Sequence, residues 1–353
     1  MNLGTEQFGG SAGLRPAAGD EMERCLETTK RGLRFTRCDS QSRGSVPPPS
    51  AMVGRVAPRA PLGSRLETAM LTWLLVLAFG LSHLSAAEEA KPAATNVVVA
   101  IFPDKALEKA VRRQVFAKRE NAEPITATDV ADIAIIEGRG LGIKDLTGLE
   151  HCRKVALINF AENQITDLKP LAGLPRLQSL DLSKNQIKSI APLATNTALQ
   201  YLELSFNQLK KLEPVAGLTN LATLLVAHNE LTDVSSAFGL PKLHSLHLDG
   251  NRVSKLKGIA GLKRLDLVSA SDNRISDLAP LQGLTDLRFL ALENNRLKDL
   301  QPLVEMAEKD MAGEHRFAPF LRLYLKGNKL TSKKALAQLE KLRGFGVKVN
   351  AGE

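Results

Sequence analysis

The residues that most often perform catalysis or bind metals are thinly spread in this sequence. His244 and His247 lie three positions apart, and His151 directly precedes Cys152. A metal site needs about three or four converging ligands, whereas two histidines at this spacing on a strand point to different faces. A cysteine nucleophile needs a nearby base and a third group that orients that base. No HExxH motif or phosphate-binding glycine loop is present, so we expect no enzymatic activity, no metal and no cofactor.

Asparagine is the residue that recurs most regularly. Its series, which we call the asparagine ladder, advances in steps of 22 residues and ends with one step of 33. The members are Asn163, Asn185, Asn207, Asn229, Asn251, Asn273, Asn295 and Asn328. An amide side chain both donates and accepts hydrogen bonds, so it can satisfy main-chain groups that a turn leaves unpaired. We therefore predict a structural role for the ladder.

Around each ladder asparagine the sequence follows the pattern L-x-x-L-x-L-x-x-N-x-[IL], with conservative replacements, as in LQSLDLSKNQI at 177–187. A repeat of about 20 to 29 residues with this core is the signature of leucine-rich repeats, in which each unit supplies one short strand and a return segment. One coil buries too few apolar side chains to fold alone, so neighbouring coils must stack. The pattern predicts an α/β solenoid over 141–330, a right-handed curved coil with a concave parallel sheet of about eight or nine short strands.

The return segment of most units reads D-L-x-P-L-x-G-L. Proline fixes φ and lacks a hydrogen-bond donor, so this segment should form turns or short 3₁₀ pieces on the convex face. A glycine recurs at one position, where we expect a backbone conformation that other residues resist. These glycines are Gly173, Gly217, Gly239, Gly261 and Gly283. The unit with ATNT at 194–197 lacks this glycine, so its turn should be locally irregular.

The segments that flank the repeats are expected to cover the open ends of the solenoid. Residues 97–140 should form a helical N-terminal cap, in which Thr126 and Asp129 have capping-box spacing. Residues 331–353 should form a C-terminal cap, with one helix and a last short strand. The final step of the ladder enlarges one repeat around 302–320, where a short outer helix is expected.

The first part of the chain differs in composition from the rest. Residues 1–69 are rich in Gly, Ser, Pro and Arg, which predicts disorder or a mis-assigned leader. Residues 70–87 hold an apolar run of about 14 residues that ends in small residues, the pattern of a secretory signal peptide. We expect translation to start at Met52 or Met70, and residues 88–96 to be a linker.

Cysteine usage agrees with export. Cys152 is the only cysteine after the predicted signal peptide, so no disulfide framework can form there. An exported protein of this kind suits a bacterial periplasm or the medium. We expect a monomer without a stable membrane span once the signal is removed. A cytoplasmic location is the alternative if the apolar segment does not direct export.

Three motifs carry a resemblance to a known family. They are FPDKALEKAV at 102–111, PITATDVADI at 124–133 and GIKDLTGLE at 142–150, followed by 22-residue units. Together they resemble the capped leucine-rich repeat domain of bacterial internalin-like proteins. The 22-residue unit is also similar to that of eukaryotic phosphatase-regulatory leucine-rich repeat proteins. The resemblance covers about residues 97–350 and implies the fold, not the partner.

Side chains alternate across a strand, so the third and fifth positions of each repeat should point out onto the concave face. We expect its earlier half to be polar and acidic and its later half to be apolar and aromatic. Exposed aromatic residues on a regular scaffold are enriched at protein interfaces. The predicted partner-binding residues are Asp181, Tyr201, Glu203, Leu225, His247, Leu267, Phe289, Arg322 and Tyr324.

The sequence therefore favours an exported, non-enzymatic module that binds a protein or a cell-surface polymer. The chain has a net charge of +9, but its lysines are dispersed over outer turns, so nucleic acid is not an expected partner. An intracellular regulatory scaffold is the first alternative, and cell fractionation separates the two. A hydrolase built on a solenoid is the second. Loss of a measured activity on mutating a concave acid such as Glu203 would support it.

Overall fold

The computed structural model describes residues 100–352. The predicted leader (1–69), signal peptide (70–87) and linker (88–96) lie outside these residues. The described residues belong to one compact unit. No helix among the described residues is both long and apolar enough to cross a membrane.

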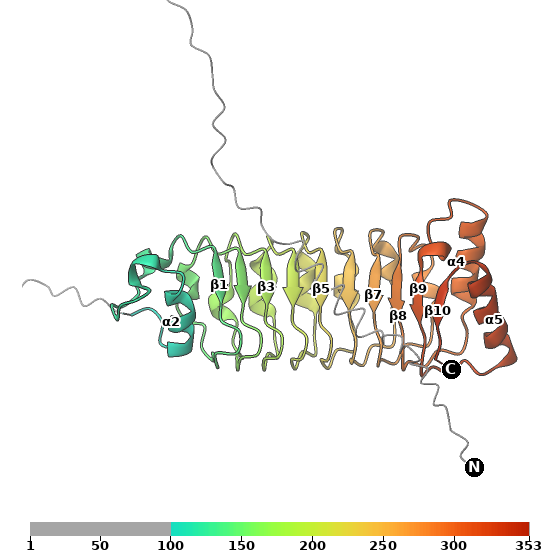
Figure 1. Ribbon diagram of the computed structural model, residues 1–353, viewed down its shortest axis with the longest axis horizontal. Helices are drawn as coiled ribbons and strands as arrows, with labels where there is room; N and C mark the ends of the chain where they lie inside the picture. Colours follow the sequence, from blue (N-terminus) through green and yellow to red (C-terminus); the bar gives the residue numbers. More distant parts are fainter. Residues whose placement is uncertain (1–99, 353) are drawn as a thin grey trace, which may run out of the picture. The chain divides into compact units, whose positions relative to one another are not determined.

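The repeats form a single parallel sheet in which the strands follow one another in chain order (Figure 1). Within 100–352 the strands are β1 (Ile135–Glu137), β2 (Leu157–Asn159), β3 (Ser179–Asp181), β4 (Tyr201–Glu203), β5 (Thr223–Leu225), β6 (Ser245–His247), β7 (Leu267–Ser269), β8 (Phe289–Ala291), β9 (Arg322–Tyr324) and β10 (Lys348–Asn350). The predicted leucine-rich repeat solenoid is confirmed, with ten strands in the described part rather than eight or nine. The sheet is longer because β1 and β10 extend it into both end segments.

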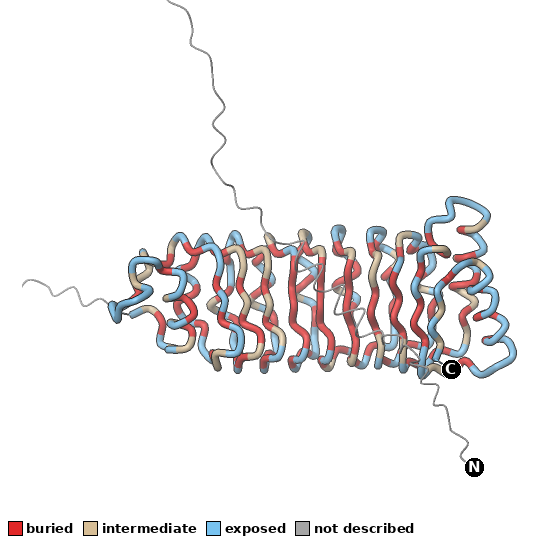
Figure 2. The backbone as a smooth tube through the Cα atoms, in the orientation of Figure 1, coloured by how far each residue is buried: buried red, intermediate tan, exposed pale blue. Residues whose placement is uncertain are grey.

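The register keeps equivalent repeat positions side by side. Leu180 pairs with Ile158 on one side and with Leu202 on the other, and the same pattern continues along the sheet. The central residues of β1 to β9 form a continuous apolar core in which each is fully buried, and Val349 of β10 is partly buried against it (Figure 2). Each coil therefore covers the apolar edge of its neighbour, as stacking requires.

The return segments contain short 3₁₀ turns, and in four of them Pro170, Pro192, Pro214 and Pro280 exclude a longer helix. The turns are η2 (Leu149–His151), η3 (Lys169–Leu171), η4 (Ala191–Thr195), η5 (Glu213–Gly217), η6 (Ser235–Ala237), η7 (Ile259–Gly261) and η8 (Ala279–Leu281). The recurrent glycines do not share one backbone conformation, contrary to expectation. Only Gly173 and Gly283 have positive φ, at 68° and 93°. A Cβ on Gly217 or Gly261 would instead lie 3.4 Å from a carbonyl oxygen of the preceding coil, so close packing favours glycine there.

The turn that was expected to be irregular resembles its neighbours. Asn196 occupies the end of η4 and is buried. Its amide donates to the carbonyl of Leu171 at 2.8 Å, and its oxygen accepts from the N–H of Gly173 at 3.0 Å. This side chain thus joins two coils on the return side. It stands where the neighbouring units have Leu174 and Leu218, and Thr195 occupies the glycine position.

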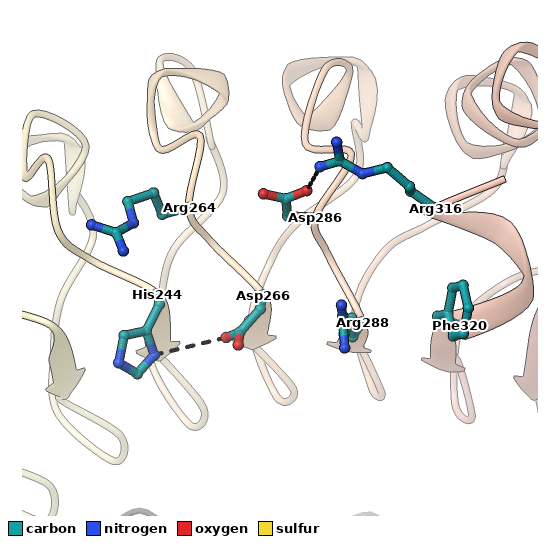
Figure 3. Close-up of a pocket in the computed structure, with 7 residues that line it drawn as sticks. All are labelled: His244, Arg264, Asp266, Asp286, Arg288, Arg316 and Phe320. Atoms are coloured by element: carbon teal, nitrogen blue, oxygen red, sulfur yellow. Dashed lines mark hydrogen bonds and ion pairs between the residues drawn. The ribbon is translucent and has the colours of Figure 1, made fainter. Parts of the chain in front are cut away.

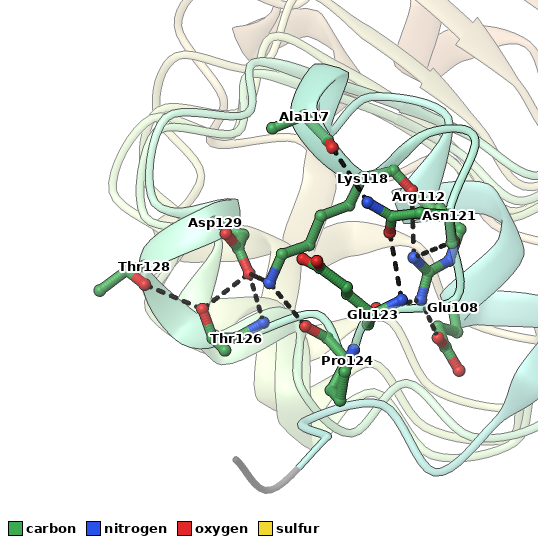
Figure 4. Close-up of polar contacts among 10 residues, drawn as sticks. All are labelled: Glu108, Arg112, Ala117, Lys118, Asn121, Glu123, Pro124, Thr126, Thr128 and Asp129. Atoms are coloured by element: carbon green, nitrogen blue, oxygen red, sulfur yellow. Dashed lines mark hydrogen bonds and ion pairs between the residues drawn. The ribbon is translucent and has the colours of Figure 1, made fainter. Parts of the chain in front are cut away.

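A small polar cluster organises the N-terminal end (Figure 4). Its elements are α2 (Lys105–Arg112), η1 (Phe116–Lys118) and α3 (Ala127–Val130). The Asp129 carboxylate accepts from both the N–H and the hydroxyl of Thr126, which places the predicted capping box at the start of α3. Lys118 contacts the same carboxylate at 2.8 Å and the carbonyl of Pro124 at 2.7 Å. The side chain of Lys118 therefore joins η1 to α3 within the cap.

Two helices lie beside each other at the other end, α4 (Gln301–Met311) and α5 (Lys333–Gly344) (Figure 1). The enlarged repeat forms α4 and the short turn η9 (Ala318–Phe320). Gln338 of α5 is buried, accepts from the N–H of Leu300 at 3.0 Å and donates to Asp299 at 2.6 Å. This side chain fastens the closing helix to the last regular coil.

Candidate functional site

Each ladder asparagine uses its amide to bridge two coils. Asn207 donates to the carbonyls of Leu204 in its own coil and of Leu182 in the preceding coil, both at 3.0 Å. Its oxygen accepts from the N–H of Ile187 at 2.9 Å. The same partners recur at the equivalent positions of the other members, for example around Asn251. Because these amides are committed to the backbone, the ladder has little capacity left for a ligand.

The residue before each ladder asparagine adopts a left-handed backbone, a feature that the sequence pattern did not indicate. The non-glycine examples in the described repeats are Glu162, Lys184, Phe206, His228, Asp272 and Asn294, with φ between 52° and 61°. Their side chains interact along this column. Phe206 and His228 stack at 4.3 Å between ring centroids. Hydrogen bonds from Arg139 and Lys184 lower the pKa of Glu162 to about 2.

The sheet face is the side of the sheet onto which the third and fifth repeat positions project. In-register pairing aligns Tyr201, Leu267, Phe289 and Arg322 in the third-position column, and Asp181, Glu203, Leu225, His247 and Tyr324 in the fifth-position column. Arg322 is exposed, and Asp181 and Leu267 are half-buried. The other members are buried.

The aromatic side chains of the sheet face were expected to be exposed, but they are buried. Tyr201 is 3 % exposed, and Phe289 and Tyr324 are each 7 % exposed. Adjacent strands lie about 4.8 Å apart, so side chains on one face pack against their cross-strand neighbours. The rings of Phe289 and Tyr324 show this packing, with centroids 5.1 Å apart. The register thus joins two residues that are far apart in the sequence into one aromatic pair.

The centre of the sheet face carries polar groups on β6 and just after it. The Ser245 hydroxyl and His247 Nε2 lie 3.0 Å apart. Burial lowers the pKa of His247 to about 4, so its imidazole is neutral near pH 7. Asp249 follows on the same face and accepts from the Ser269 hydroxyl at 2.6 Å and the Ser271 N–H at 2.8 Å. The strand alternation, extended by one further step, could have identified Asp249 from the sequence.

Three polar atoms of this face have no hydrogen-bond partner in the described part of the chain. They are Tyr201 Oη, His247 Nδ1 and Asp249 Oδ2, all buried. A Ser-His pair acts as a nucleophile and base when a carboxylate orients the other imidazole nitrogen. That nitrogen of His247 has no such contact, so Ser245 and His247 do not form a triad.

The remaining residues singled out for chemistry do not converge. His244 lies at the edge of the sheet, 3.8 Å from Asp266, whereas His247 projects onto the sheet face. Cys152 is fully buried, and burial together with the Glu150 charge raises its pKa to about 12. Within residues 100–352 no three His, Cys, Asp or Glu side chains are placed to hold a metal ion.

A charged cavity of about 720 Å³ lies at the edge where β6, β7 and β8 begin, and we call it the flank cavity (Figure 3). Its lining residues are His244, Arg264, Asp266, Asp286, Arg288, Arg316 and Phe320. Sequence reasoning missed it because these residues come from four coils and belong to two different repeat positions. The positions are those just before the first and third residues of the repeat motif, together with residues of the enlarged repeat.

The enlarged repeat supplies the C-terminal wall of the flank cavity. The Asp310 carboxylate accepts from the backbone N–H groups of Arg316, Phe317 and Ala318, at 2.8 to 3.1 Å. Burial raises the pKa of Asp310, but these hydrogen bonds more than offset it, and the net shift is downward. The connection between α4 and η9 is therefore fixed, and with it the positions of Arg316 and Phe320.

Comparisons with known proteins agree with this architecture. Family models described as "Leucine Rich repeats (2 copies)" and "Leucine rich repeat" match residues 155–195 and 262–305, and residues 197–253, respectively. The chain is similar to the crystal structure of internalin C2 from Listeria monocytogenes, with 32 % identity and a TM-score of 0.56 over 58 % of this chain and 91 % of that one. It is also similar to an internalin (inlF) from the same organism, with 25 % identity and a TM-score of 0.56 over 71 % of this chain and 76 % of that one.

Proposed function

Because the chain belongs to the leucine-rich repeat proteins and its repeat domain is internalin-like, we propose that it is an exported, non-enzymatic module whose sheet face binds another protein. Leucine-rich repeat domains expose a long regular surface that suits protein–protein contact. The choice of partner then depends on residues that the repeat does not fix. On this sheet those residues occupy the outward columns.

The observation that carries the proposal is the contrast in hydrogen bonding between the ladder and the sheet face. The ladder amides are used by the backbone, as at Asn207. Tyr201 Oη, His247 Nδ1 and Asp249 Oδ2 have no partner in the described residues. Unsatisfied buried polar groups are rare in proteins and ask for an explanation. A rearrangement of the neighbouring side chains of the sheet face on binding would let a partner form hydrogen bonds with these three atoms.

The aromatic end of the sheet face supports the same proposal. Phe289 and Tyr324 form a rigid pair, and Arg322 beside them is exposed. Tyrosine, tryptophan and arginine account for much of the binding energy at protein interfaces, and they act best in preorganised clusters. We therefore place the strongest contacts of the partner at β8 and β9.

The binding test compares the full chain with a variant in which Tyr201, Phe289 and Tyr324 are replaced by alanine. We expect the variant to lose capture of proteins from the native envelope fraction while it retains its circular dichroism spectrum. Phe116→Ala is the control, because Phe116 is 87 % exposed and lies in the N-terminal segment. Equal capture by the triple variant and the wild type would contradict the proposal.

Export is the second part of the proposal, and the apolar run within 70–87 supports it. Cell fractionation and amino-terminal sequencing test it directly. The only tryptophan of the chain, Trp73, lies in this run, so the processed protein should show no emission on excitation at tryptophan-selective wavelengths. A cytoplasmic protein that retains Trp73 would instead favour an intracellular regulatory scaffold.

A further inference from the structure

The flank cavity presents charges in two rows that run across the coils (Figure 3). One row contains His244, Asp266 and Arg288, each directly before a strand, and the other contains Arg264, Asp286 and Arg316. The cavity contains three arginines and two aspartates. Its volume falls within the range of about 300–1,000 Å³ that ligand pockets usually have.

The three arginines of the flank cavity differ in the ion pairs that they form within the protein. Arg316 pairs with Asp286 and also with Glu314, the latter at 3.0 Å. Arg264 is exposed and forms no ion pair within residues 100–352. Arg288 forms no contact of ion-pair length there either, and its guanidinium carbon lies 5.8 Å from the centroid of the Phe320 ring. Burial raises the pKa of Asp266, and the charge of Arg288 offsets part of that rise. Arg264 and Arg288 thus keep their hydrogen-bond donors for a ligand.

We propose that the flank cavity binds an acidic side chain of a partner polypeptide. Arg264 and Arg288 would donate to its carboxylate, since guanidinium groups match the geometry of carboxylates and form strong charge-assisted hydrogen bonds. The ring of Phe320, which is 56 % exposed, would pack against the apolar part of the same segment. This inference rests on the proposed binding function and adds a second contact region with a defined chemistry.

The charges of the cavity favour a polypeptide over a uniformly anionic polymer. Asp286 lies between Arg264 and Arg316 in one row, and Asp266 lies between His244 and Arg288 in the other (Figure 3). Every further phosphate, sulfate or uronate group of a polymer would meet one of these carboxylates. Juxtaposed like charges suppress wrong partners. A peptide can place a single carboxylate between the arginines and a neutral or basic side chain beside each aspartate.

The cavity is also continuous with the aromatic end of the sheet face. Arg288 directly precedes Phe289, and Phe320 lies two residues before Arg322. Sequence neighbours on a strand point to opposite sides, so one segment of backbone serves both surfaces. A partner that covers Phe289 and Tyr324 can therefore place an acidic residue over the edge of the sheet.

The test uses the full chain and a capped peptide of glutamate, phenylalanine and glutamate as the probe. Its matched control replaces both glutamates by glutamine. Binding is followed by nuclear magnetic resonance on the Nε–H groups of Arg264 and Arg288, assigned by substitution. We expect Arg264→Gln and Arg288→Gln each to weaken binding by roughly tenfold or more. Arg264→Lys should weaken binding less than Arg264→Gln, because it keeps the charge but loses the bidentate geometry.

Arg176→Gln is the matched protein control. Arg176 occupies the same repeat position as Arg264, four coils earlier, is likewise exposed and does not line the cavity. It should leave the affinity for the acidic peptide unchanged. Equal binding of the glutamine peptide, or an equal effect of Arg176→Gln, would overturn the proposal. Tighter binding of heparin than of the peptide, with loss in the same two variants, would overturn it in favour of an anionic polymer.

This experiment separates the two proposals because it does not need the natural partner. The peptide should still bind the variant in which Tyr201, Phe289 and Tyr324 are alanine. If that variant retains full capture of envelope proteins while the arginine variants lose the peptide, the sheet-face proposal fails and the flank cavity stands. If the peptide shows no arginine-dependent binding while the triple variant loses capture, the reverse holds.

Discussion

At the scale of single residues, the asparagines of the ladder use the hydrogen-bonding groups of their side chains almost completely. Asn251 is buried, and its amide donates to the carbonyls of Val226 and Leu248, both at 2.9 Å. Its oxygen accepts from the N–H of Leu231 at 3.0 Å. One side chain thus satisfies main-chain groups of two coils at a place where the turn offers them no other partner.

We predict that Asn251→Ala destabilises the solenoid by about 2–4 kcal/mol, because it leaves several buried backbone groups unsatisfied. The free energy of unfolding from urea denaturation measures the effect. Asn220→Ala is the control, since that side chain makes exposed contacts with Thr197 and Lys242 and should change the stability by less than about 1 kcal/mol. Equal losses in the two variants would contradict the structural role of the ladder.

Gly250 and Gly327 are the two glycine members of the left-handed column that precedes the ladder, and Gly250 lies in its middle part. Gly250 has a φ of 64°, and a Cβ at this position would meet the imidazole ring of His228. Glycine is therefore favoured here for two reasons, the backbone conformation and the stacked ring of the preceding coil.

Gly250→Ala should destabilise the protein by about 1–2 kcal/mol, the backbone penalty plus displacement of the ring. In a His228→Ala background only the backbone penalty should remain. Thermal or urea unfolding of the four proteins of this double-mutant cycle gives the coupling energy. A coupling energy of zero would show that His228 moves aside freely.

At the scale of elements, Asp104 links the first helix to the first repeat. One carboxylate oxygen accepts from the N–H groups of Ala106 and Leu107 at the start of α2, and the other accepts from those of Lys144 and Asp145. Burial raises the pKa of Asp104, but these four hydrogen bonds offset it, and the pKa lies below its ordinary value of 3.8.

We predict that Asp104→Ala costs about 1–2 kcal/mol near pH 7, the usual loss for an N-cap. The pKa is lowered in the folded state, so the contribution of Asp104 is present above pH 4 and is lost as the pH falls through the folded-state pKa. The difference in unfolding free energy between wild type and variant should therefore shrink below about pH 4. A difference that is constant from pH 7 to pH 2 would mean that the ionised carboxylate is not the capping species.

Asp310 has a similar role at the other end, where it fixes the connection from α4 to η9. This connection exists because the last repeat step is 33 residues long. The insertion places Arg316 and Phe320 against the edge of the preceding coils. The enlarged repeat thus completes the flank cavity. Our second binding proposal rests on this cavity.

At the scale of the whole molecule, stability depends on covering both ends of the stacked coils. The closing segment contributes α5, the edge strand β10 and the buried side chain of Gln338. Without it, the apolar side of the last coil and the unpaired edge of β9 would face water. Solenoids need such caps for solubility, and exposed strand edges promote aggregation.

We predict that a chain ending at Thr331 aggregates or loses its last coils, whereas a chain that lacks only residues 351–353 behaves as wild type. Size-exclusion chromatography with light scattering detects aggregation. The circular dichroism melt detects loss of the last coils. A monomeric truncated chain with an unchanged melting temperature would show that α5 and β10 are not required as a cap.

Much of the architecture could be predicted from the sequence because the contacts that determine it are local and periodic. The ladder and the leucine positions predict one strand per coil, and Pro170 or Pro280 predicts a 3₁₀ turn rather than a helix. The strand β1 was not predicted, because three residues beside a short helix carry too weak a signal. The turn at Asn196 was wrongly expected to be irregular, since the hydrogen bonds that regularise it join Asn196 to two backbone groups of another coil.

The sequence by itself therefore determined the repeat, the inward and outward positions of each strand and the need for caps, because all three follow from burying apolar side chains at a fixed period. Only the tertiary structure decided which outward residues meet. It paired Phe289 with Tyr324 and left Tyr201 Oη and His247 Nδ1 without partners. It also brought Arg264 and Arg288 to one cavity. Such encounters depend on stacking and on the long insertion, and stacking places residues 22 or more positions apart side by side.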